Sequence, residues 1–409
     1  MTLQQQQQLE ERYVMHTFGR KPVDLVEGSG MVVRDDEGKE YLDFIGGIGV
    51  ISLGHCHPAL VEAVTEQAKR LMHVSNYYYI EGRGQLAEKL SNLLNECVAA
   101  DEAEPWQTFF ANSGAEANEC AIKLARLHGR CVAQQQGLSS LPRTIVTLER
   151  SFHGRTLATL AATAQPVKQE IFQPLPDGFV AVPNNDIAAL EELFEQMGDQ
   201  ICGMLLEPVQ GECGVYPCSE EYLQAARRLT EANDALLMFD EVQCGMFRCG
   251  TYPFGFQHAR VLPDVVTMAK GIAGGIPMGA CSARASIAAI FEPGVHGSTF
   301  GGSNIAIAAA NAVLDTVAKE GIAKNAEEVG AYLRERLAEL PHVSEVRGKG
   351  LMVAVDLEDS CDAPGIVAAA LEQGLLINAT GAHTLRFLPP LVCSREDVDT
   401  LIARLGALL

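Results

Sequence analysis

Lys270 and Asp240 each stand at the carboxyl end of an apolar run. VLPDVVTMAK, which begins at Val261, ends on Lys270, and ALLMFD ends on Asp240. A charge at the end of a buried strand is tolerated only with a partner or a chemical role. If the two strands finish at one edge of a sheet, an amine nucleophile and a carboxylate face the same crevice. That combination indicates Schiff-base chemistry on a bound pyridine cofactor.

Both residues also have a plain structural interpretation. Asp240 could cap a helix after its strand, and Lys270 could be an exposed lysine, the usual fate of that residue. The glycine-rich stretch GIAGGIPMG after Lys270 favours a ligand, because glycine lets the backbone approach it closely. A carboxylate ~4 Å from a ring nitrogen contributes about 4 kcal/mol at an effective dielectric of ~20, which keeps that nitrogen protonated near neutral pH.

The turn SGAEANE holds small residues directly before a predicted helix. Ser113, Gly114 and Ala115 would lie at the helix N-terminus, where unpaired N–H groups and the positive dipole end favour an anion such as phosphate. The alternative is a capping box, with Ser113 as the cap and Glu116 three residues on.

Two arginines stand in settings suited to carboxylate binding. FHGRT offers an aromatic face at Phe152 and a guanidinium at Arg155, and LRFLPP sets Arg386 among apolar residues. The aromatic could instead be core, and the arginines could be structural. A buried arginine needs an anion, and Glu207 and Glu212 of LEPVQGE are candidates.

Composition excludes several classes of partner. The chain of 409 residues carries a formal net charge of −21, which argues against a nucleic-acid or anionic-membrane surface. No apolar run is long enough to span a bilayer, and none of the 12 cysteines forms a CxxC pair, so we expect reduced thiols in a cytoplasmic protein. The cluster GHCHP lacks the further ligands that a metal site needs, and we expect no metal.

The pattern of elements predicts an α/β fold. A glutamine-rich leader precedes a hairpin that turns at Asp36 to Gly38. Helical and strand patterns then alternate, which favours a mostly parallel sheet covered by helices, with ligands beyond the carboxyl ends of its strands. A long helical stretch from Ala306 leads into a smaller C-terminal α+β unit. The predicted buried strands are TFFAN, TIVTLER, GMLLEPV, ALLMFDEV and DVVTMAKG.

The order of the motifs GHCHP, SGAEANE, FHGRT, EPVQGE, FDEVQ, the Lys270 strand end, GSTFGG and LRF resembles the class III (ω-type) pyridoxal-phosphate aminotransferases from about Tyr13 to the C-terminus. The resemblance implies the fold type I of pyridoxal-phosphate-dependent transferases. It implies a large α/β domain with a mostly parallel sheet at 61–305 and a small α+β domain built from both termini, 1–60 and 306–409. It also implies a homodimer with the active site at the subunit boundary.

The resemblance assigns roles by position. Lys270 is similar to the lysine that binds the cofactor aldehyde, and Asp240 to the partner of the pyridine nitrogen. The remaining cofactor contacts would be Ser113, Gly114 and Ala115 at the phosphate, Phe152 on the ring, Glu241 and Val242 beside Asp240, Gln243 near the 3′ oxygen, and Thr299 from the neighbouring subunit. The substrate contacts would be Arg155, Ser298, Arg386 and the gate residue Glu212.

Within the family, GGIGVISLGHCHP, HVSNYYY, DEVQCGMFR and HGSTFGG are most similar to members that transfer the δ-amine of N-acetyl-L-ornithine to 2-oxoglutarate in arginine biosynthesis. Ile48 stands where ornithine-specific members carry a tyrosine, and an isoleucine suits an acylated α-amine. The departures FRCG and Ser303-Asn304 fall outside the proposed catalytic groups. Succinylornithine, ornithine, 4-aminobutyrate and N-succinyldiaminopimelate remain alternative substrates. A non-catalytic cofactor-binding regulator and a nicotinamide-cofactor protein are alternatives of other classes, but no basic DNA-binding region and no GxGxxG supports them.

Overall fold

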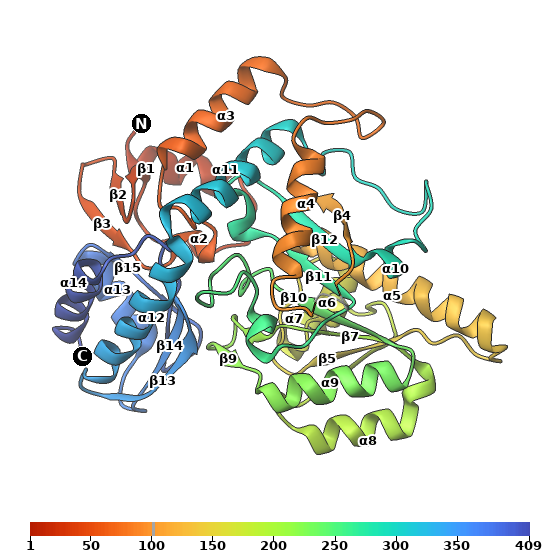
Figure 1. The fold of residues 1–409 in the computed structure, drawn as a ribbon. Coiled ribbons are helices and arrows are strands. Elements are labelled where there is room, and N and C mark those ends of the chain that lie inside the picture. Colours follow the sequence, from red (N-terminus) through yellow and green to blue (C-terminus); the bar gives the residue numbers. More distant parts are fainter. Residues whose placement is uncertain (100–102) are drawn as a thin grey trace.

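A sheet of seven strands runs through the centre of the computed structural model, which describes residues 1–99 and 103–409 (Figure 1). In spatial order its strands are β4 (Trp106–Ala111), β12 (Gly279–Arg284), β11 (Val265–Met268), β10 (Leu236–Asp240), β7 (Ile201–Leu206), β5 (Thr144–Leu148) and β6 (Phe179–Val182). β10 is parallel to β7 and β11, and β5 is parallel to β6 and β7. Only β12 runs antiparallel to its neighbours β11 and β4. The predicted mostly parallel sheet is therefore confirmed.

Helices cover both faces of this sheet, as the alternation of side chains along β10 shows. Leu237 and Phe239 join the hydrophobic cluster that includes Tyr222 of α9 (Glu220–Ala232). Leu236 and Met238 join a second cluster formed with α5 (Gly114–Gln136). Because successive strand residues point to opposite faces, α5 and α9 lie on opposite sides of the sheet.

The other helices of the central region are α3 (Pro58–Arg70), α4 (Arg83–Leu94), α6 (Leu157–Ala162), α7 (Pro166–Gln169), α8 (Ile187–Met197) and α10 (Ala285–Ala288). Short 3-10 turns complete it: η1 (Glu170–Phe172), η2 (Gly198–Gln200), η3 (Gly255–Ala259) and η4 (Lys270–Ala273). A small ribbon, β8 (Val209–Gln210) with β9 (Tyr216–Pro217), follows β7.

Two smaller sheets lie at the left of Figure 1, and the first of them combines strands from both ends of the chain. One contains β1 (Leu25–Ser29), β2 (Val32–Asp35), β3 (Glu40–Asp43) and β15 (Leu375–Leu376). The other contains β13 (Val343–Lys349), β14 (Met352–Leu357), β17 (Thr384–Phe387) and β16 (Asn378–Ala379). The predicted hairpin is confirmed as β2 and β3, and Leu42 of β3 pairs in parallel with Leu375. We propose the division at 1–60, 61–305 and 306–409 on this basis.

The predicted long helical stretch from Ala306 is two helices. α11 (Asn304–Glu320) and α12 (Ile322–Ala338) are separated by Gly321, whose φ of 68° is left-handed and ends the first helix. The C-terminal helices are α13 (Ala363–Glu372) and α14 (Arg395–Gly406). The leader forms α1 (Leu3–Tyr13), which buries no residue, and α2 (Gly46–Gly49) is a single turn.

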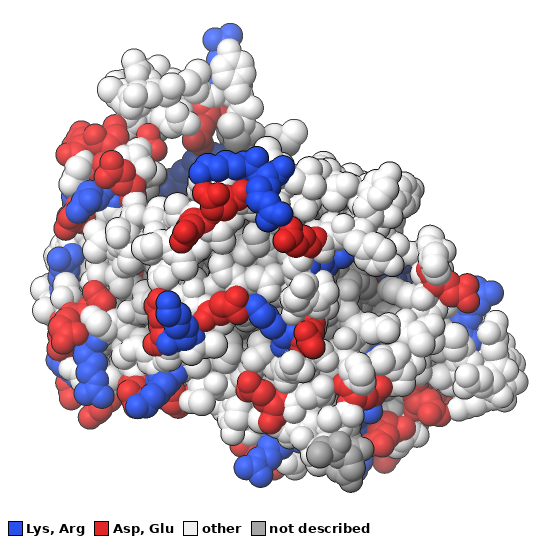
Figure 2. All heavy atoms as spheres, turned by 45° about the horizontal axis from the view of Figure 1, so that its top comes forward, with Lys and Arg blue, Asp and Glu red and all other residues white. Residues whose placement is uncertain are grey.

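The surface carries both signs of charge. On the face seen in Figure 2, acidic and basic side chains are interspersed, and pairs of opposite sign lie side by side. Across residues 1–99 and 103–409, we find no helix with the length and apolarity needed to cross a bilayer.

Candidate active site

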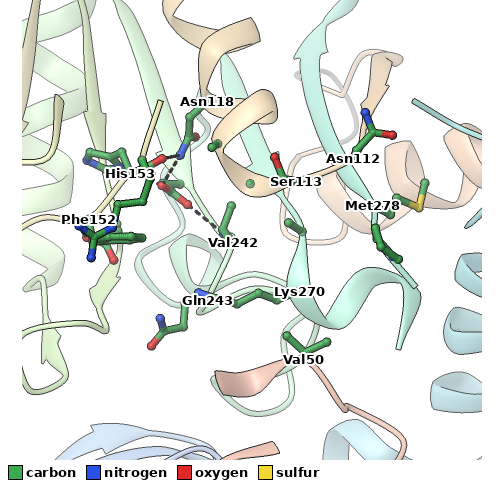
Figure 3. A pocket seen from close by; sticks show the side chains of 18 of the residues that line it. Val50, Asn112, Ser113, Asn118, Phe152, His153, Val242, Gln243, Lys270 and Met278 are labelled. Atoms are coloured by element: carbon green, nitrogen blue, oxygen red, sulfur yellow. Dashed lines mark hydrogen bonds and ion pairs between the residues drawn. The ribbon is translucent and has the colours of Figure 1, made fainter. Parts of the chain in front are cut away.

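A cavity of about 440 Å³ opens at the carboxyl ends of β10 and β11, within the size range of small-molecule sites. The proposed cofactor and substrate residues among its lining are Ser113, Gly114, Ala115, Phe152, Arg155, Asp240, Val242, Gln243 and Lys270. Figure 3 shows the Lys270 side chain extending from its strand end toward Gln243. Residues separated by up to 157 positions in the sequence therefore face one space, as the strand-end argument predicted.

Lys270 begins the turn η4, two residues after β11 ends. Its φ is 46°, a left-handed value that is unfavourable for a side chain larger than glycine and is often found at functional sites. Burial lowers the pKa of Lys270, Glu212 and Asp240 raise it, and Arg386 lowers it further; the net shift is downward. A larger share of the amine is therefore unprotonated near neutral pH than for an exposed lysine.

Asp240, the last residue of β10, is almost fully buried and fixed by three donors. Its Oδ1 accepts the N–H of Val242 over 3.0 Å. Its Oδ2 lies 2.7 Å from both Nδ2 of Asn118 and Nδ1 of His153. The carboxylate lines the cavity in an orientation that it cannot change without breaking these bonds.

Asn118 and His153 were missed as functional candidates from the sequence. Asn118 lies on the buried face of α5 and accepts a hydrogen bond from Oγ1 of Thr267 over 2.6 Å. A polar residue on the apolar face of a helix was the available signal for it. His153 lies inside the FHGRT motif, and its Nε2 is buried without a hydrogen-bond partner. Its position between an aromatic residue and a glycine, just after a buried strand, was the signal there.

The N-terminus of α5, where the sequence predicts an anion site, lines the cavity. The side chain of Ser113 caps the helix by accepting the N–H of Glu116 over 3.2 Å, so the capping interpretation also holds. The Glu116 side chain does not complete the capping box, because it accepts the N–H of Asn112. A Cβ on Gly114 would lie 2.8 Å from the Val242 side chain, so only glycine fits at this start of the helix.

Phe152 is held by a buried carboxylate. Its backbone N–H donates to Oε2 of Glu207 over 3.0 Å, and the N–H of Gly211 donates to Oε1 over 3.3 Å. Burial raises the pKa of Glu207 to about 7. Within residues 1–99 and 103–409, no arginine lies within ion-pair distance of Glu207, so of the two expected arginine partners only Glu212 pairs. Glu207 links the aromatic loop to the turn that carries Glu212.

Arg386 of β17 is buried and faces Glu212. Its Nη1 donates to Oε1 of Glu212 over 3.1 Å, to the carbonyl of Gly211 over 2.9 Å and to Oε1 of Gln243 over 3.3 Å. Burial alone would raise the pKa of Glu212, but Arg386 and Lys270 outweigh it and the pKa is lowered. Arg155 is exposed, lines the cavity and lies over the Phe152 ring, with 5.5 Å from its Cζ to the ring centroid.

Glu241 and Val242 differ in their placement. Val242 lines the cavity and donates to Asp240. The carboxylate of Glu241 accepts the N–H groups of Gly255 and Phe256, each over 2.9 Å, and burial raises its pKa to about 7. Glu241 does not line the cavity. Its side chain serves the η3 turn, so we assign it no direct cofactor contact.

Ser298 and Thr299 lie outside the Lys270 cavity. Both line a second hollow, where Thr299 is exposed. Ser298 is tied to the first cavity because its Oγ accepts Nδ2 of Asn112 over 3.0 Å. Thr299 therefore does not face the Lys270 cavity of its own chain, and the cofactor contact expected from the resemblance would require a neighbouring subunit.

The histidines of GHCHP make separate contacts. Nε2 of His55 lies 2.8 Å from Oδ2 of Asp43, and Nε2 of His57 lies 3.5 Å from Oε2 of Glu320. Among residues 1–99 and 103–409 there is no group of three His, Cys, Asp or Glu placed to hold a metal ion.

These features fit pyridoxal phosphate. Gly114 leaves open the backbone N–H groups of a helix N-terminus, a cradle that a Cβ could not share with Val242. Asp240 offers a fixed, almost fully buried carboxylate to a ring nitrogen, and Phe152 offers an aromatic face. Lys270 supplies an amine whose lowered pKa suits a bond to an aldehyde.

Comparison with known proteins agrees with this chemistry. The family model "Aminotransferase class-III" matches residues 14–409. The chain is 45% identical to an acetylornithine aminotransferase of Caldanaerobacter subterraneus subsp. tengcongensis over 406 residues, covering 98% of both chains. It is 47% identical to an acetylornithine aminotransferase of Gloeobacter violaceus, covering 97% of this chain and 96% of the relative.

Solved structures give the same picture of the fold. The acetylornithine aminotransferase of Elizabethkingia anophelis superposes with a TM-score of 0.85 at 32% identity, covering 100% of this chain and 99% of that one. The ornithine aminotransferase of Toxoplasma gondii superposes with a TM-score of 0.91 at 29% identity, covering 100% of this chain and 95% of that one.

Proposed function

The chain belongs to the class-III aminotransferases, and from this premise we propose that it transfers the δ-amino group of N-acetyl-L-ornithine to 2-oxoglutarate. The products are N-acetyl-L-glutamate 5-semialdehyde and L-glutamate, a step of arginine biosynthesis. The full-length similarity to acetylornithine aminotransferases supports this choice of substrate.

The observation that carries the proposal is the unequal state of the two arginines. Arg386 is neutralised by Glu212, whereas Arg155 is exposed beside the cavity. N-acetylornithine has one carboxylate, distant from the reacting amine, and one free guanidinium suits it. 2-Oxoglutarate has two carboxylates and requires that Arg386 also become free. Ile48 lacks a hydroxyl that could meet the free α-amine of ornithine, which favours the acylated substrate.

Pyridoxal 5′-phosphate is the cofactor of this family, and when bound it supplies an aldehyde carbon and an electron-accepting ring. Ser113, Gly114 and Ala115 would hold its phosphate, Phe152 its ring face and Asp240 its ring nitrogen. The amine of Lys270 takes a proton from the substrate carbon that bears the reacting nitrogen. It then gives a proton to the carbon that the cofactor's aldehyde supplies. Its lowered pKa favours the base form for the first of these transfers.

The substrate residues then act in turn. Arg155 binds the α-carboxylate of acetylornithine and, in the second half-reaction, the distal carboxylate of 2-oxoglutarate. Arg386 binds the α-carboxylate of 2-oxoglutarate after Glu212 has moved aside. Ser298, through Asn112, holds the edge of the site. We assign Gln243 to the carboxylate site of Arg386, because it contacts both Glu212 and Arg386.

The assembly that we propose is a cytoplasmic homodimer. Thr299 lies in the hollow away from Lys270, so it would serve the cavity of the neighbouring subunit. Exposed Tyr77, Tyr79 and Phe300 from the same region would be covered there.

A panel of amino donors tests the function. Purified protein loaded with pyridoxal phosphate is mixed with N-acetylornithine, succinylornithine, ornithine, 4-aminobutyrate or N-succinyldiaminopimelate, and loss of the cofactor's aldehyde-form absorbance is followed. We expect kcat/KM for N-acetylornithine to exceed that for ornithine by at least ~10-fold, since ~1.4 kcal/mol of selective binding suffices for that ratio. A higher value for any other donor would replace acetylornithine as the substrate.

A further inference from the structure

Lys168 is a half-buried lysine in the short helix α7, and its segment is pinned on both sides. Nε2 of Gln165 donates to the carbonyl of Ser151 over 2.7 Å. Nε2 of Gln169 donates to the carbonyl of Thr163 over 2.8 Å. These bonds fix the backbone around Lys168 against the loop that carries the aromatic wall of the cavity.

Two cations lie over the ring of Phe152, which forms part of that wall. Nζ of Lys168 lies 5.1 Å from the centroid of Phe152, and Cζ of Arg155 lies 5.5 Å from the same centroid. Across residues 1–99 and 103–409, no carboxylate lies within ion-pair distance of either cation. Phe152 and Arg155 line the cavity, whereas Lys168 reaches it only through its contact with the Phe152 ring.

The charged side chains that most affect Lys168 are two residues of the proposed substrate site, Glu212 and Arg155. Burial lowers the pKa of Lys168, Glu212 raises it and Arg155 lowers it. The ammonium therefore lies within the field of both substrate-site residues. It is repelled by Arg155, and it is drawn toward Glu212, whose carboxylate is engaged with Arg386.

A cation–π contact is a sufficient reason for one cation over an exposed ring. It does not account for a second cation at the same ring, because two positive charges repel each other. An anion between them would be attracted by both and would relieve that repulsion.

We propose that Lys168 is the second cation of the carboxylate subsite at Arg155, so that one substrate carboxylate is bound by both side chains. For the identity of the substrates this inference rests on the proposed function. The subsite then takes the α-carboxylate of the amino donor and the distal carboxylate of the keto acid. Lys168 determines affinity for both substrates and leaves the proton transfer to Lys270.

The test compares Lys168→Met, which removes the charge, with Lys168→Arg, which keeps it. Lys39→Met is the matched control, since Nζ of Lys39 lies 4.9 Å from the ring centroid of Tyr41, and Tyr41 does not line the cavity whereas Phe152 does. KM and kcat are measured for N-acetylornithine and 2-oxoglutarate. The binding of glutarate, a dicarboxylate with no reacting group, is measured by calorimetry on the cofactor-loaded protein.

For Lys168→Met we expect KM for both substrates and Kd for glutarate to rise about 5- to 10-fold, with kcat within ~2-fold of the parent. For Lys168→Arg and Lys39→Met, the KM values, the Kd for glutarate and kcat should all stay within ~2-fold of the parent. Unchanged glutarate affinity in Lys168→Met, or a fall in kcat without a rise in KM, overturns the proposal. Equal weakening in Lys168→Arg also overturns it, because charge would then not matter. If the parent fails to turn over N-acetylornithine, the proposed function falls, while the glutarate titration still decides the role of Lys168.

Discussion

Arg386 and Glu212 form an ion pair beside Gln243, which lines the cavity, with Nη1 of Arg386 3.1 Å from Oε1 of Glu212. The same carboxylate oxygen accepts Nε2 of Gln243 over 3.2 Å. Glu212 is therefore held from two sides, and a substrate carboxylate that takes its place must replace both bonds. A 2-oxo acid can do this with its α-carboxylate, whereas an amine at the end of an aliphatic chain cannot.

Glu212→Ala tests this exchange. Without the carboxylate, Arg386 remains an unpaired buried cation while N-acetylornithine is bound, whereas 2-oxoglutarate and glutamate still neutralise it. We expect kcat/KM of the acetylornithine half-reaction to fall about 10-fold and that of the glutamate half-reaction by less than ~3-fold. Single-turnover absorbance measurements give both values, and equal losses would remove the gate role of Glu212.

Gly211→Ala tests whether Gln243 holds the Arg386 side chain in place. A Cβ at Gly211 would lie 1.9 Å from Oε1 of Gln243, so Gln243 must leave its contact with Arg386. We expect KM for 2-oxoglutarate to rise about 10-fold, because Arg386 loses its orientation. Gly381→Ala is the control, since its Cβ would meet only Thr384 Oγ1 at 3.8 Å. A Gly211→Ala variant with unchanged KM would mean that Gln243 has no part in holding Arg386.

The strand ends were predictable because burial leaves a strong local mark. Asp240 and Lys270 each follow a continuous apolar run, and a charge there is unusual enough to indicate a site. β12 was not predicted. Its residues Gly279 to Ala283 are small and lack the β-branched pattern of strands. At Gly279 the structure shows a reason, because a Cβ there would collide with the carbonyl oxygen of Ser113.

The contacts between motifs were not predictable from spacing. Gln243, Glu212 and Arg386 meet although they come from three separate segments. His153 reaches Asp240 across 87 positions of the chain. Such pairs are fixed by the order of strands in the sheet and by loop geometry, which no local periodicity encodes. The resemblance supplied the roles of the residues, and the structure adds their hydrogen-bond partners.

Asp240→Asn tests the fixed carboxylate. The amide keeps the volume but presents N–H groups to Nδ2 of Asn118 or Nδ1 of His153, which are donors toward Asp240. We expect kcat to fall about 10²- to 10³-fold and the cofactor to be lost more readily on dialysis. Asp264→Asn, at the opposite end of β11, is the control that should lower Tm without affecting cofactor retention. Retained cofactor and near-normal kcat in Asp240→Asn would exclude Asp240 as the ring partner.

Lys270→Met tests the cost of placing an amine in the cavity of the cofactor-free protein. The pKa of Lys270 is lowered in the folded state, chiefly by burial. At a pH between its folded pKa and the unfolded value of 10.5, the unfolded chain binds more protons than the native one, so stability rises with pH in this window. Below the folded pKa the full penalty applies. The methionine variant, which has no charge to desolvate, should therefore unfold about 1–3 °C higher at pH 7.

The advantage of Lys270→Met should shrink as the pH rises toward 10.5, because a growing share of the parent amine is then neutral in both the folded and the unfolded state. Thermal unfolding of both cofactor-free proteins, followed by circular dichroism from pH 7 to pH 10.5, measures this trend. Lys319→Met on the exposed end of α11 should give no pH-dependent difference from the parent. If Lys270→Met matched the parent at every pH, or if its advantage grew with pH, Lys270 would not be a destabilised cation, and its role as a proton acceptor near neutral pH would lose its physical basis.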